Sequence, residues 1–411
     1  MSILIPIYGV DEAVEVPLDA LPSDAGDVID LLKGETASLD HWLRCALAYY
    51  VRGDVEAFKQ VLSESLEIPE DIFPDSKTDR VGLVTALANH NVHCAAASTD
   101  RPRRVWDAAS QLFSRADAVD YSDPRIWTGR GFMSLYRNDL DKARSHFEQA
   151  LRTGPLRPLA LLGKACACYR LGSHAEALRL FKQLMCVCRD PPPGLRLGLG
   201  LCYAKLKQPA LARRCFARAL ELDPEDRAAA IALAVSEASD GDDPEAVRAG
   251  VERLAKLYAE DPTDANVLNH LANHAFYRRD FDTVGALRRK AYEHSAAPQV
   301  RAESCFHQAR VLHAQGQWTG AQQFYAEAIN LAPNFHLAQY GLAQVLVHEG
   351  ELPSAATALA RALKAAPDSP PVLKLLGHVH TELGQQDDAM RHLKQLTVVA
   401  PDDPDAWCML A

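Results

Sequence analysis

The stretch Pro193–Asp226, PGLRLGLGLCYAKLKQPALARRCFARALELDPED, decides the fold, because it recurs in altered form along most of the 411-residue chain. When Pro193 is counted as position 1, small residues stand at positions 8, 20 and 27, aromatic residues at 11 and 24, and proline at 32: Gly200, Ala212, Ala219, Tyr203, Phe216 and Pro224. Small residues let two helices approach closely, and the rings fill the space between them. Pro224 ends the second helix, because proline disfavours helix at the preceding residue. The stretch therefore predicts a closely packed helix pair.

This spacing is the tetratricopeptide repeat (TPR) pattern, in which each 34-residue unit forms a helix A and a helix B. The sequence of the repeats is rich in alanine and contains little of the β-branched alternation that is typical of strands, which favours an all-α protein. A chain of 411 residues exceeds the size that one core usually serves, and a stacked array avoids that limit. We therefore predict a right-handed TPR superhelix, an α-solenoid, with a short extended N-terminal segment.

The pattern divides the chain into four segments. Residues 1–22 are acidic and proline-containing, and they predict an extended segment with a short hairpin around Tyr8 and Gly9. Residues 23–123 predict degenerate helical repeats with an insertion in 76–120, including helices over 83–97 and 105–118, and Ser23 or Asp24 as the first N-cap.

Residues 124–403 predict eight regular repeats, of which one is four residues longer than the period. Its extra residues are expected in the turn DGDDPE between helix A and helix B. Residues 404–411 begin the helix A of a further repeat. Half a repeat cannot bury its apolar face, so we expect the sequence to be the N-terminal portion of a longer protein.

Charge and composition exclude several classes of function. Residues 1–80 hold 17 Asp and Glu against six Lys and Arg, a net charge of −11, which leaves +1 of the total of −10 for the remainder. Direct nucleic-acid binding needs a concentrated basic face, and none is expected here. No apolar run reaches 18 residues, so no membrane span is expected. Ten scattered cysteines predict free, buried thiols in a reducing compartment.

Few residues suggest chemistry. His270 and His274 have the i, i+4 spacing of a two-histidine metal site, but no Glu stands beside His270 and no third ligand is evident. Two C-x-C pairs, Cys166 with Cys168 and Cys186 with Cys188, favour buried thiols, because residues two apart on a helix point in different directions. No phosphate-binding glycine loop occurs. We therefore expect no enzyme, no cofactor and no catalytic or metal residues.

A TPR array offers a groove, lined by positions 2, 5, 9 and 12 of the A helices. The groove residues predicted in this way are Phe132, Leu162, Cys166, Leu197, Leu201, Asn269, Asn273, Phe306, Arg310, Tyr340 and Gln344. Apolar anchors in the middle of this row, followed by amide-bearing side chains, suit an extended peptide of a partner protein. Any one of these residues could equally be filling space between neighbours, so the row is better evidence than its members.

Two other classes of protein remain open. A co-chaperone adaptor clamps a terminal carboxylate with Lys and Asn on consecutive A helices. Leucines occupy those places in the central repeats, and only Asn269, Asn273 and Arg310 keep this alternative open. The N-terminal TPR region of a glycosyltransferase is the second alternative, and an αβ pattern after residue 411 would favour it.

The non-consensus text resembles one family over essentially the whole chain. The order of IPI, DEAVEVPLDALP, DVIDLLK, HWLRCALAYYVRGDVEAF, LALLGKACACY, VLNHLANHAFYRRDF and RAESCFHQAR is similar to the large TPR scaffold subunit of the RNA polymerase II associated factor (Paf) complex. The region from Ser65 to Tyr121 departs from that family's pattern.

The resemblance implies a nuclear scaffold that holds the other Paf-complex subunits on elongating RNA polymerase II and supports co-transcriptional histone ubiquitination and methylation. It also implies that the subunit giving the complex its name lays an N-terminal segment against the superhelix. The apolar groove is consistent with a permanent partner, because permanent interfaces are more hydrophobic than transient ones.

Overall fold

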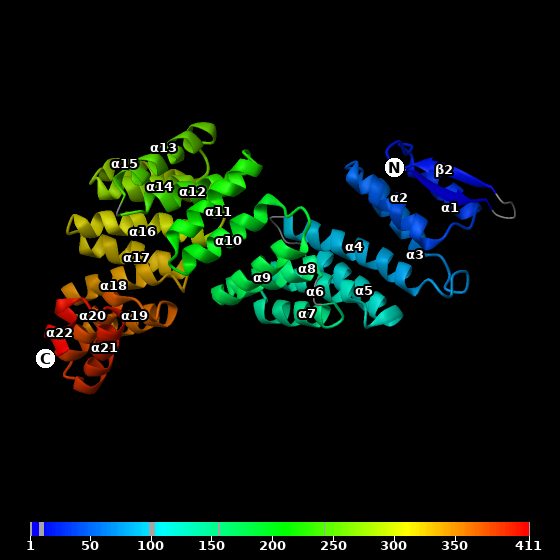
Figure 1. Ribbon diagram of the computed structural model, residues 1–411. Coiled ribbons are helices and arrows are strands. Elements are labelled where there is room, and N and C mark those ends of the chain that lie inside the picture. Colours follow the sequence, from blue (N-terminus) through cyan, green and yellow to red (C-terminus); the bar gives the residue numbers. More distant parts are fainter. Residues whose placement is uncertain (1, 8–11, 98–102, 155–156, 242, 411) are drawn as a thin grey trace. The chain divides into compact units, whose positions relative to one another are not determined.

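The computed structural model describes residues 2–7, 12–97, 103–154, 157–241 and 243–410. It divides into an N-terminal unit, residues 1–218, and a C-terminal unit, residues 219–411. In the described residues, a two-stranded sheet is followed by helices that pack in successive pairs (Figure 1). The prediction of an all-α repeat array with a short extended N-terminal segment is confirmed. None of the described helices is both long and apolar enough to cross a membrane.

The N-terminal unit contains β1 (Ser2–Pro6), β2 (Ala13–Pro17), α1 (Ala25–Gly34), α2 (Leu39–Val51), α3 (Val55–Leu66), α4 (Lys77–Ala97), α5 (Arg103–Asp120), α6 (Pro124–Tyr136), α7 (Leu140–Arg152), α8 (Pro158–Arg170), α9 (His174–Val187), α10 (Pro193–Lys205) and most of α11 (Pro209–Leu222).

The C-terminal unit contains α12 (Arg227–Ala238), α13 (Pro244–Glu260), α14 (Ala265–Tyr277), α15 (Phe281–His294), α16 (Pro298–Ala314), α17 (Trp318–Leu331), α18 (His336–His348), α19 (Leu352–Ala365), α20 (Pro370–Glu382), α21 (Gln386–Val399) and α22 (Pro404–Leu410).

The two N-terminal strands form an antiparallel hairpin in which Ile3 pairs with Val16. Successive side chains of a strand point to opposite faces of the sheet. Ile3, Ile5 and Val16 are buried in one cluster with residues of α1, α2 and α3, whereas Leu4 is exposed. The predicted extended segment is therefore paired with itself and covers the first helices. Tyr8 and Gly9, the expected turn, lie outside the described residues.

The small residues of the repeat lie where helices meet, as the pattern predicts. In the repeat quoted first, a Cβ atom added at Gly200 would lie 2.3 Å from Phe216 Cε1. Phe147 of α7 is fully buried, and its ring lies against one glycine on each neighbouring A helix. A Cβ atom added at Gly131 of α6 would lie 2.5 Å from the ring, and one added at Gly163 of α8 would lie 2.1 Å from it. Only glycine leaves room for the aromatic ring at these places.

The degenerate region is more helical than the sequence predicts. Of the two residues expected to cap the first helix, Asp24 is the N-cap. Its carboxylate accepts a hydrogen bond from the Gly26 amide at 2.8 Å. Helix α4 begins at Lys77, six residues before the predicted start, and α5 ends at Asp120, two residues after the predicted end. Helix α4 is buried on several sides, between α2, α3, α5 and α6. A helix covered in this way lacks the one-sided apolar stripe from which its start could be found.

The long repeat corrects one expectation. Its extra residues do not all fall in the turn, because α13 has 17 residues against 14 in α11. Asp243 caps α13 at its N-terminus and Pro244 occupies the first turn, so the helix gains a turn before Gly250. Gly250 takes the place of the small residue at position 20, since a Cβ there would lie 2.6 Å from the carbonyl oxygen of Ala234 in α12. Sequence length alone could not distinguish a longer helix from a longer turn.

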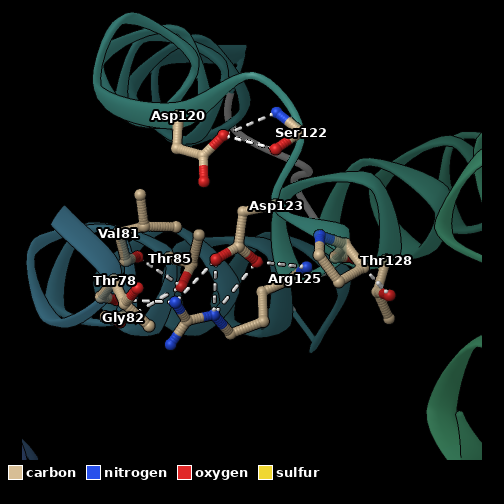
Figure 2. A network of polar contacts seen from close by, with 10 residues as sticks. Thr78, Val81, Gly82, Thr85, Asp120, Ser122, Asp123, Arg125 and Thr128 are labelled. Atoms are coloured by element: carbon tan, nitrogen blue, oxygen red, sulfur yellow. Dashed lines mark hydrogen bonds and ion pairs between the residues drawn. The ribbon is translucent and has the colours of Figure 1, made fainter. Parts of the chain in front are cut away.

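A polar network joins α6 to α4 (Figure 2). The buried carboxylate of Asp123 caps α6 by accepting from the Arg125 amide at 2.8 Å. The Arg125 side chain also binds this carboxylate through Nε and Nη2, and its Nη2 donates to the Thr78 carbonyl oxygen of α4 at 2.6 Å. One carboxylate therefore satisfies a helix end and holds the arginine that connects two helices.

We expect Asp123→Ala to lower the free energy of unfolding of the N-terminal unit by about 1–2 kcal/mol, because a helix cap is lost and Arg125 is left without its partner. Asp123→Asn keeps a capping oxygen and is expected to cost less. Urea titration followed by far-ultraviolet circular dichroism measures both. An Asp123→Ala protein with unchanged stability would contradict the role of the network.

Contacts between elements are local in the chain. In the described residues, every substantial contact joins helices that are neighbours in the sequence order or are separated by one helix. Such contacts are typical of repeat proteins, in which each repeat is stabilised by its immediate neighbours.

Candidate partner-binding surfaces

The predicted groove residues of the N-terminal unit all lie on A helices. Phe132 is on α6, Leu162 and Cys166 are on α8, and Leu197 and Leu201 are on α10. The members of each pair are four residues apart and share a helix face. Leu201 is 36% exposed and the other four are half-buried. A partner could therefore contact these apolar side chains without unfolding the repeat.

An apolar cavity of about 690 Å³ extends this surface toward the N-terminus. It is formed by α2, α3, α4, α6 and α8, and its lining includes Leu47, Tyr50, Phe58, His90, Phe132 and Leu159. The rings of Tyr50 and Phe58 lie 5.0 Å apart, and that of His90 lies 5.3 Å from Phe58. Burial lowers the pKa of His90, so this imidazole is neutral at neutral pH.

Of this cavity, the sequence predicted only Phe132. The missed residues could have been found with the same rule, because Leu47 and Tyr50 stand at positions 9 and 12 of the degenerate repeat that begins at Leu39, and Leu159 stands at position 2 of its repeat. The rule could not predict that Phe58 lines the cavity, because Phe58 is on a B helix, at a position where the repeat pattern has alanine.

In the C-terminal unit, Asn273 and Arg310 are brought together and Asn269 is not available. Asn273 Oδ1 accepts from Arg310 Nη1 at 2.8 Å, which links α14 to α16. Asn269 is only 1% exposed; its Nδ2 donates to the Val300 carbonyl oxygen at 3.0 Å and its Oδ1 accepts from Ser304 at 2.9 Å. Both amide atoms of Asn269 are used within the chain, so we leave it out of the partner contacts.

Arg310 is surrounded by aromatic rings. Its guanidinium carbon lies 3.7 Å from the ring centre of Phe276 and 5.3 Å from those of Tyr277 and Phe306. Cations over aromatic faces are attracted by the ring electrons. Burial lowers the pKa of Arg310, which nevertheless stays charged, since a guanidinium does not lose its proton in proteins.

Two further cavities open in the C-terminal unit. One of about 510 Å³ is lined by Asn273, Tyr277, His270 and His274 of α14 together with residues of α12 and α13. The other, of about 610 Å³, is lined by Tyr340 together with residues of α20 and α22. Burial raises the pKa of Tyr340, and a hydrogen bond from Gln344 opposes that shift.

The histidines and cysteines do not form a reactive centre in the described residues. Burial lowers the pKa of both His270 and His274, and no group of three possible metal ligands occurs in the described part of the chain. Burial raises the pKa of Cys168 to about 11. Such a thiol stays protonated and is a poor nucleophile at neutral pH.

All ten cysteines are free, as predicted. The expectation that they are buried holds for Cys45, Cys168, Cys202 and Cys305 but is wrong for Cys94, Cys186 and Cys408, which are exposed. The other three, Cys166, Cys188 and Cys215, are half-buried. Residues two apart on a helix face different directions, and in the pair Cys186 and Cys188 the side chain of Cys186 faces solvent.

Family models of the tetratricopeptide repeat match residues 135–185, 195–226, 312–376 and 346–411. The chain is 32% identical to the "Protein CTR9 homolog" of Arabidopsis thaliana over 99% of this chain and 38% of that protein. It is 26% identical to the "RNA polymerase-associated protein CTR9" of Caenorhabditis elegans over 92% of this chain and 34% of that protein. The Saccharomyces cerevisiae protein of the same name is 25% identical over 84% and 34% of the two chains.

The chain thus spans less than two fifths of the length of these relatives. Among solved structures, the Cut9 and Hcn1 hetero-tetramer of APC/C matches with a TM-score of 0.52 and 12% identity, over 90% of this chain and 75% of that chain. This likeness shows the fold alone. Together with the repeat models, it confirms the TPR array.

Proposed function

Since this chain is homologous to the N-terminal portion of the RNA polymerase-associated CTR9 proteins, we propose that it is the non-catalytic scaffold region of a nuclear Paf-complex subunit. In this function the A helices bind an extended segment of another subunit. The assembled complex acts on elongating RNA polymerase II and supports co-transcriptional histone modification. This region itself is not expected to contact nucleic acid.

The observation that carries the proposal is the exposed apolar surface of the A helices in the N-terminal unit. Leu201 is exposed, Leu197 lies one turn before it, and the cavity around Phe132 is large enough for an apolar side chain of a partner. Exposed apolar side chains that gather on one surface are a common mark of a binding site. Peptides bound in such grooves are held by a few apolar anchors.

Replacing both Leu197 and Leu201 with Glu is expected to weaken partner binding at least tenfold, because two carboxylates would have to be buried without partners. Both leucines are accessible to solvent, so helicity and melting temperature should stay nearly unchanged. The measurement is affinity purification of the tagged chain from nuclei, followed by mass spectrometry of the Paf-complex subunits recovered.

Leu211→Glu is the matched control, because Leu211 is 38% exposed on α11, the B helix of the same repeat, and lies outside the predicted row. This variant should recover the subunits as the unmodified chain does. Retained binding in the double variant would reject the groove assignment, and recovery of no Paf-complex subunit by the unmodified chain would reject the function.

A further inference from the structure

Arg310 is a half-buried cation for which the described part of the chain supplies no counter-ion. Two other half-buried arginines have one, since Arg130 forms an ion pair with Asp117 and Arg227 binds Asp264 at 3.0 Å. The buried Arg80 is held instead by two backbone carbonyl oxygens. The polar partners of Arg310 among the described residues are neutral: the amide oxygen of Asn273 and the hydroxyl group of Tyr277. No carboxylate of these residues lies within 4.0 Å of its guanidinium. Burying a charge without an opposite charge is costly.

In the described part of α14 and α16, no titratable side chain forms an ion pair with Arg310. Glu303 lies two turns before it on α16, where burial raises the pKa of the carboxyl group and a hydrogen bond from Asn269 opposes that shift. His270 of α14 and His307 of α16 are neutral, since burial lowers the pKa of His270 and lowers that of His307 to about 3. The rings of Phe276 and Phe306 provide only partial negative charge at their faces.

The guanidinium is nevertheless oriented and accessible. The hydrogen bond to Asn273 uses one of its five N–H groups, and the guanidinium carbon lies over the ring of Phe276. Arg310 itself is only partly buried. Two of the side chains that hold it, Asn273 and Tyr277, also line the 510 Å³ cavity of α12, α13 and α14. A ligand in that cavity would therefore lie beside the groups that position Arg310.

From this geometry we propose that Arg310 binds the carboxylate of an Asp or Glu side chain within the partner's extended segment, which rests on the proposed function. A planar guanidinium and a carboxylate form two parallel hydrogen bonds, which adds direction to the charge attraction. The carboxylate supplies the counter-ion that the described part of the chain does not provide.

Two other anions fit less well. A C-terminal carboxylate would need a second donor on the neighbouring A helix, and both amide atoms of Asn269 are already bonded within the chain. A phosphate group carries nearly two negative charges and is usually bound by several arginines. Arg310 is the one cation that the described structure places in this aromatic cluster.

The test uses the full chain and overlapping peptides of the partner subunit recovered by affinity purification, each blocked by N-terminal acetylation and C-terminal amidation. Binding is measured by fluorescence anisotropy. We expect at least one blocked, acidic peptide to bind the unmodified chain and to bind Arg310→Gln about tenfold more weakly, because a charge-assisted pair is lost. Replacing the critical Asp or Glu of the peptide with Asn or Gln should weaken binding by the same factor. When this peptide is combined with Arg310→Gln, affinity should fall little further than with either change alone, because both changes remove the same pair.

Arg301→Gln is the matched control, because Arg301 is on the same helix, lies 5.0 Å from the ring centre of Tyr292 and donates to the Ser295 carbonyl oxygen. It should leave binding unchanged. Arg310→Lys keeps the charge but not the planar fork, so it should fold and bind with intermediate affinity. The change in the peptide tests the same pair in the unmodified chain, whether or not Arg310→Gln folds.

Dependence on Arg310 that appears only with a free C-terminal carboxylate, or only with a phosphorylated peptide, would overturn the proposal. So would equal binding of acidic peptides to the unmodified chain and to Arg310→Gln. The proposed function is tested separately by Leu197 and Leu201, which lie in the other unit. Loss of binding in that double variant, with no effect at Arg310, would retain the scaffold and reject the anion site.

Discussion

Replacing Gly163 with alanine is expected to lower the free energy of unfolding of the N-terminal unit by about 3 kcal/mol, at the upper end for overpacked cores. The added Cβ would lie 2.1 Å from Phe147 Cζ, far inside van der Waals contact. Phe147 cannot move away, because it is fully buried and Gly131 lies against the same ring. Helices α7 and α8 would have to separate. Guanidinium titration followed by circular dichroism measures the loss.

A glycine in the middle of a helix ordinarily gives the opposite result, because alanine is the better helix former by about 0.5–1 kcal/mol. Gly194→Ala is therefore the control, since Gly194 is exposed on α10 and an added Cβ would meet no atom within 4 Å. It should leave stability unchanged or raise it. Phe147→Leu combined with Gly163→Ala should cost less than the sum of the two changes, because the smaller side chain leaves room for the methyl group.

A stabilising effect of Gly163→Ala would contradict the close approach of the helices on which the fold depends. If the stability losses of Gly163→Ala and Phe147→Leu were additive, the destabilisation by Gly163→Ala would not come from a clash with the ring of Phe147.

Acid is expected to destabilise the C-terminal unit below pH 6.5, chiefly through His307. Burial lowers the pKa of His307 to about 3 in the folded chain, from 6.5 when unfolded. The unfolded chain therefore binds the proton more readily, and the stability present above pH 6.5 is lost as the pH falls toward 3. The slope approaches about 1.4 kcal/mol per pH unit for one group once the unfolded imidazole is protonated, hence a loss of about 2 kcal/mol between pH 6.5 and 4.5.

The cause is that His307 is almost fully buried and its Nδ1 has no hydrogen-bond partner in the described residues. His270, His274 and His313 of the same unit act in the same direction, because burial lowers the pKa of each. Urea titrations at a series of pH values measure the effect. Between pH 7.5 and 8.5 these histidines are neutral in both states and should contribute no slope.

His307→Gln removes the titrating group. The stability difference between the unmodified chain and this variant should be constant above pH 7 and should shift in favour of the variant by about 1.4 kcal/mol per pH unit below 6.5. Parallel pH curves for the two proteins would show that His307 does not cause the acid sensitivity.

The recurring small residues predicted the fold well because they report directly on helix contacts. Gly200 and Ala212 stand at their repeat positions in the sequence. In the structure, Gly200 lies against the ring of Phe216 and Ala212 is fully buried. The length of α13 and the start of α4 could not be read in this way. Their boundaries depend on neighbouring helices that cover more than one side, and no local sequence pattern records that cover.

The candidate site was predicted less completely. Helix positions located Leu197, Leu201 and Arg310 on A helices, but position alone did not show that Asn269 is bonded within the chain. Nor did it show that none of the described carboxylates forms an ion pair with Arg310. Both properties depend on which side chains of the next repeat reach across. The sequence predicts the row of residues, and the contacts decide which members are free to bind.

The local pattern of helix contacts has a consequence for synthesis on the ribosome. In the described residues, every substantial contact joins helices at most two apart in the sequence order. A repeat that leaves the ribosome can therefore pack at once against the repeat that was synthesised before it. No apolar face has to wait for a distant segment, and few long-range contacts have to close late. Each unit can therefore fold while translation continues, which limits the time during which nascent apolar helices are exposed to aggregation.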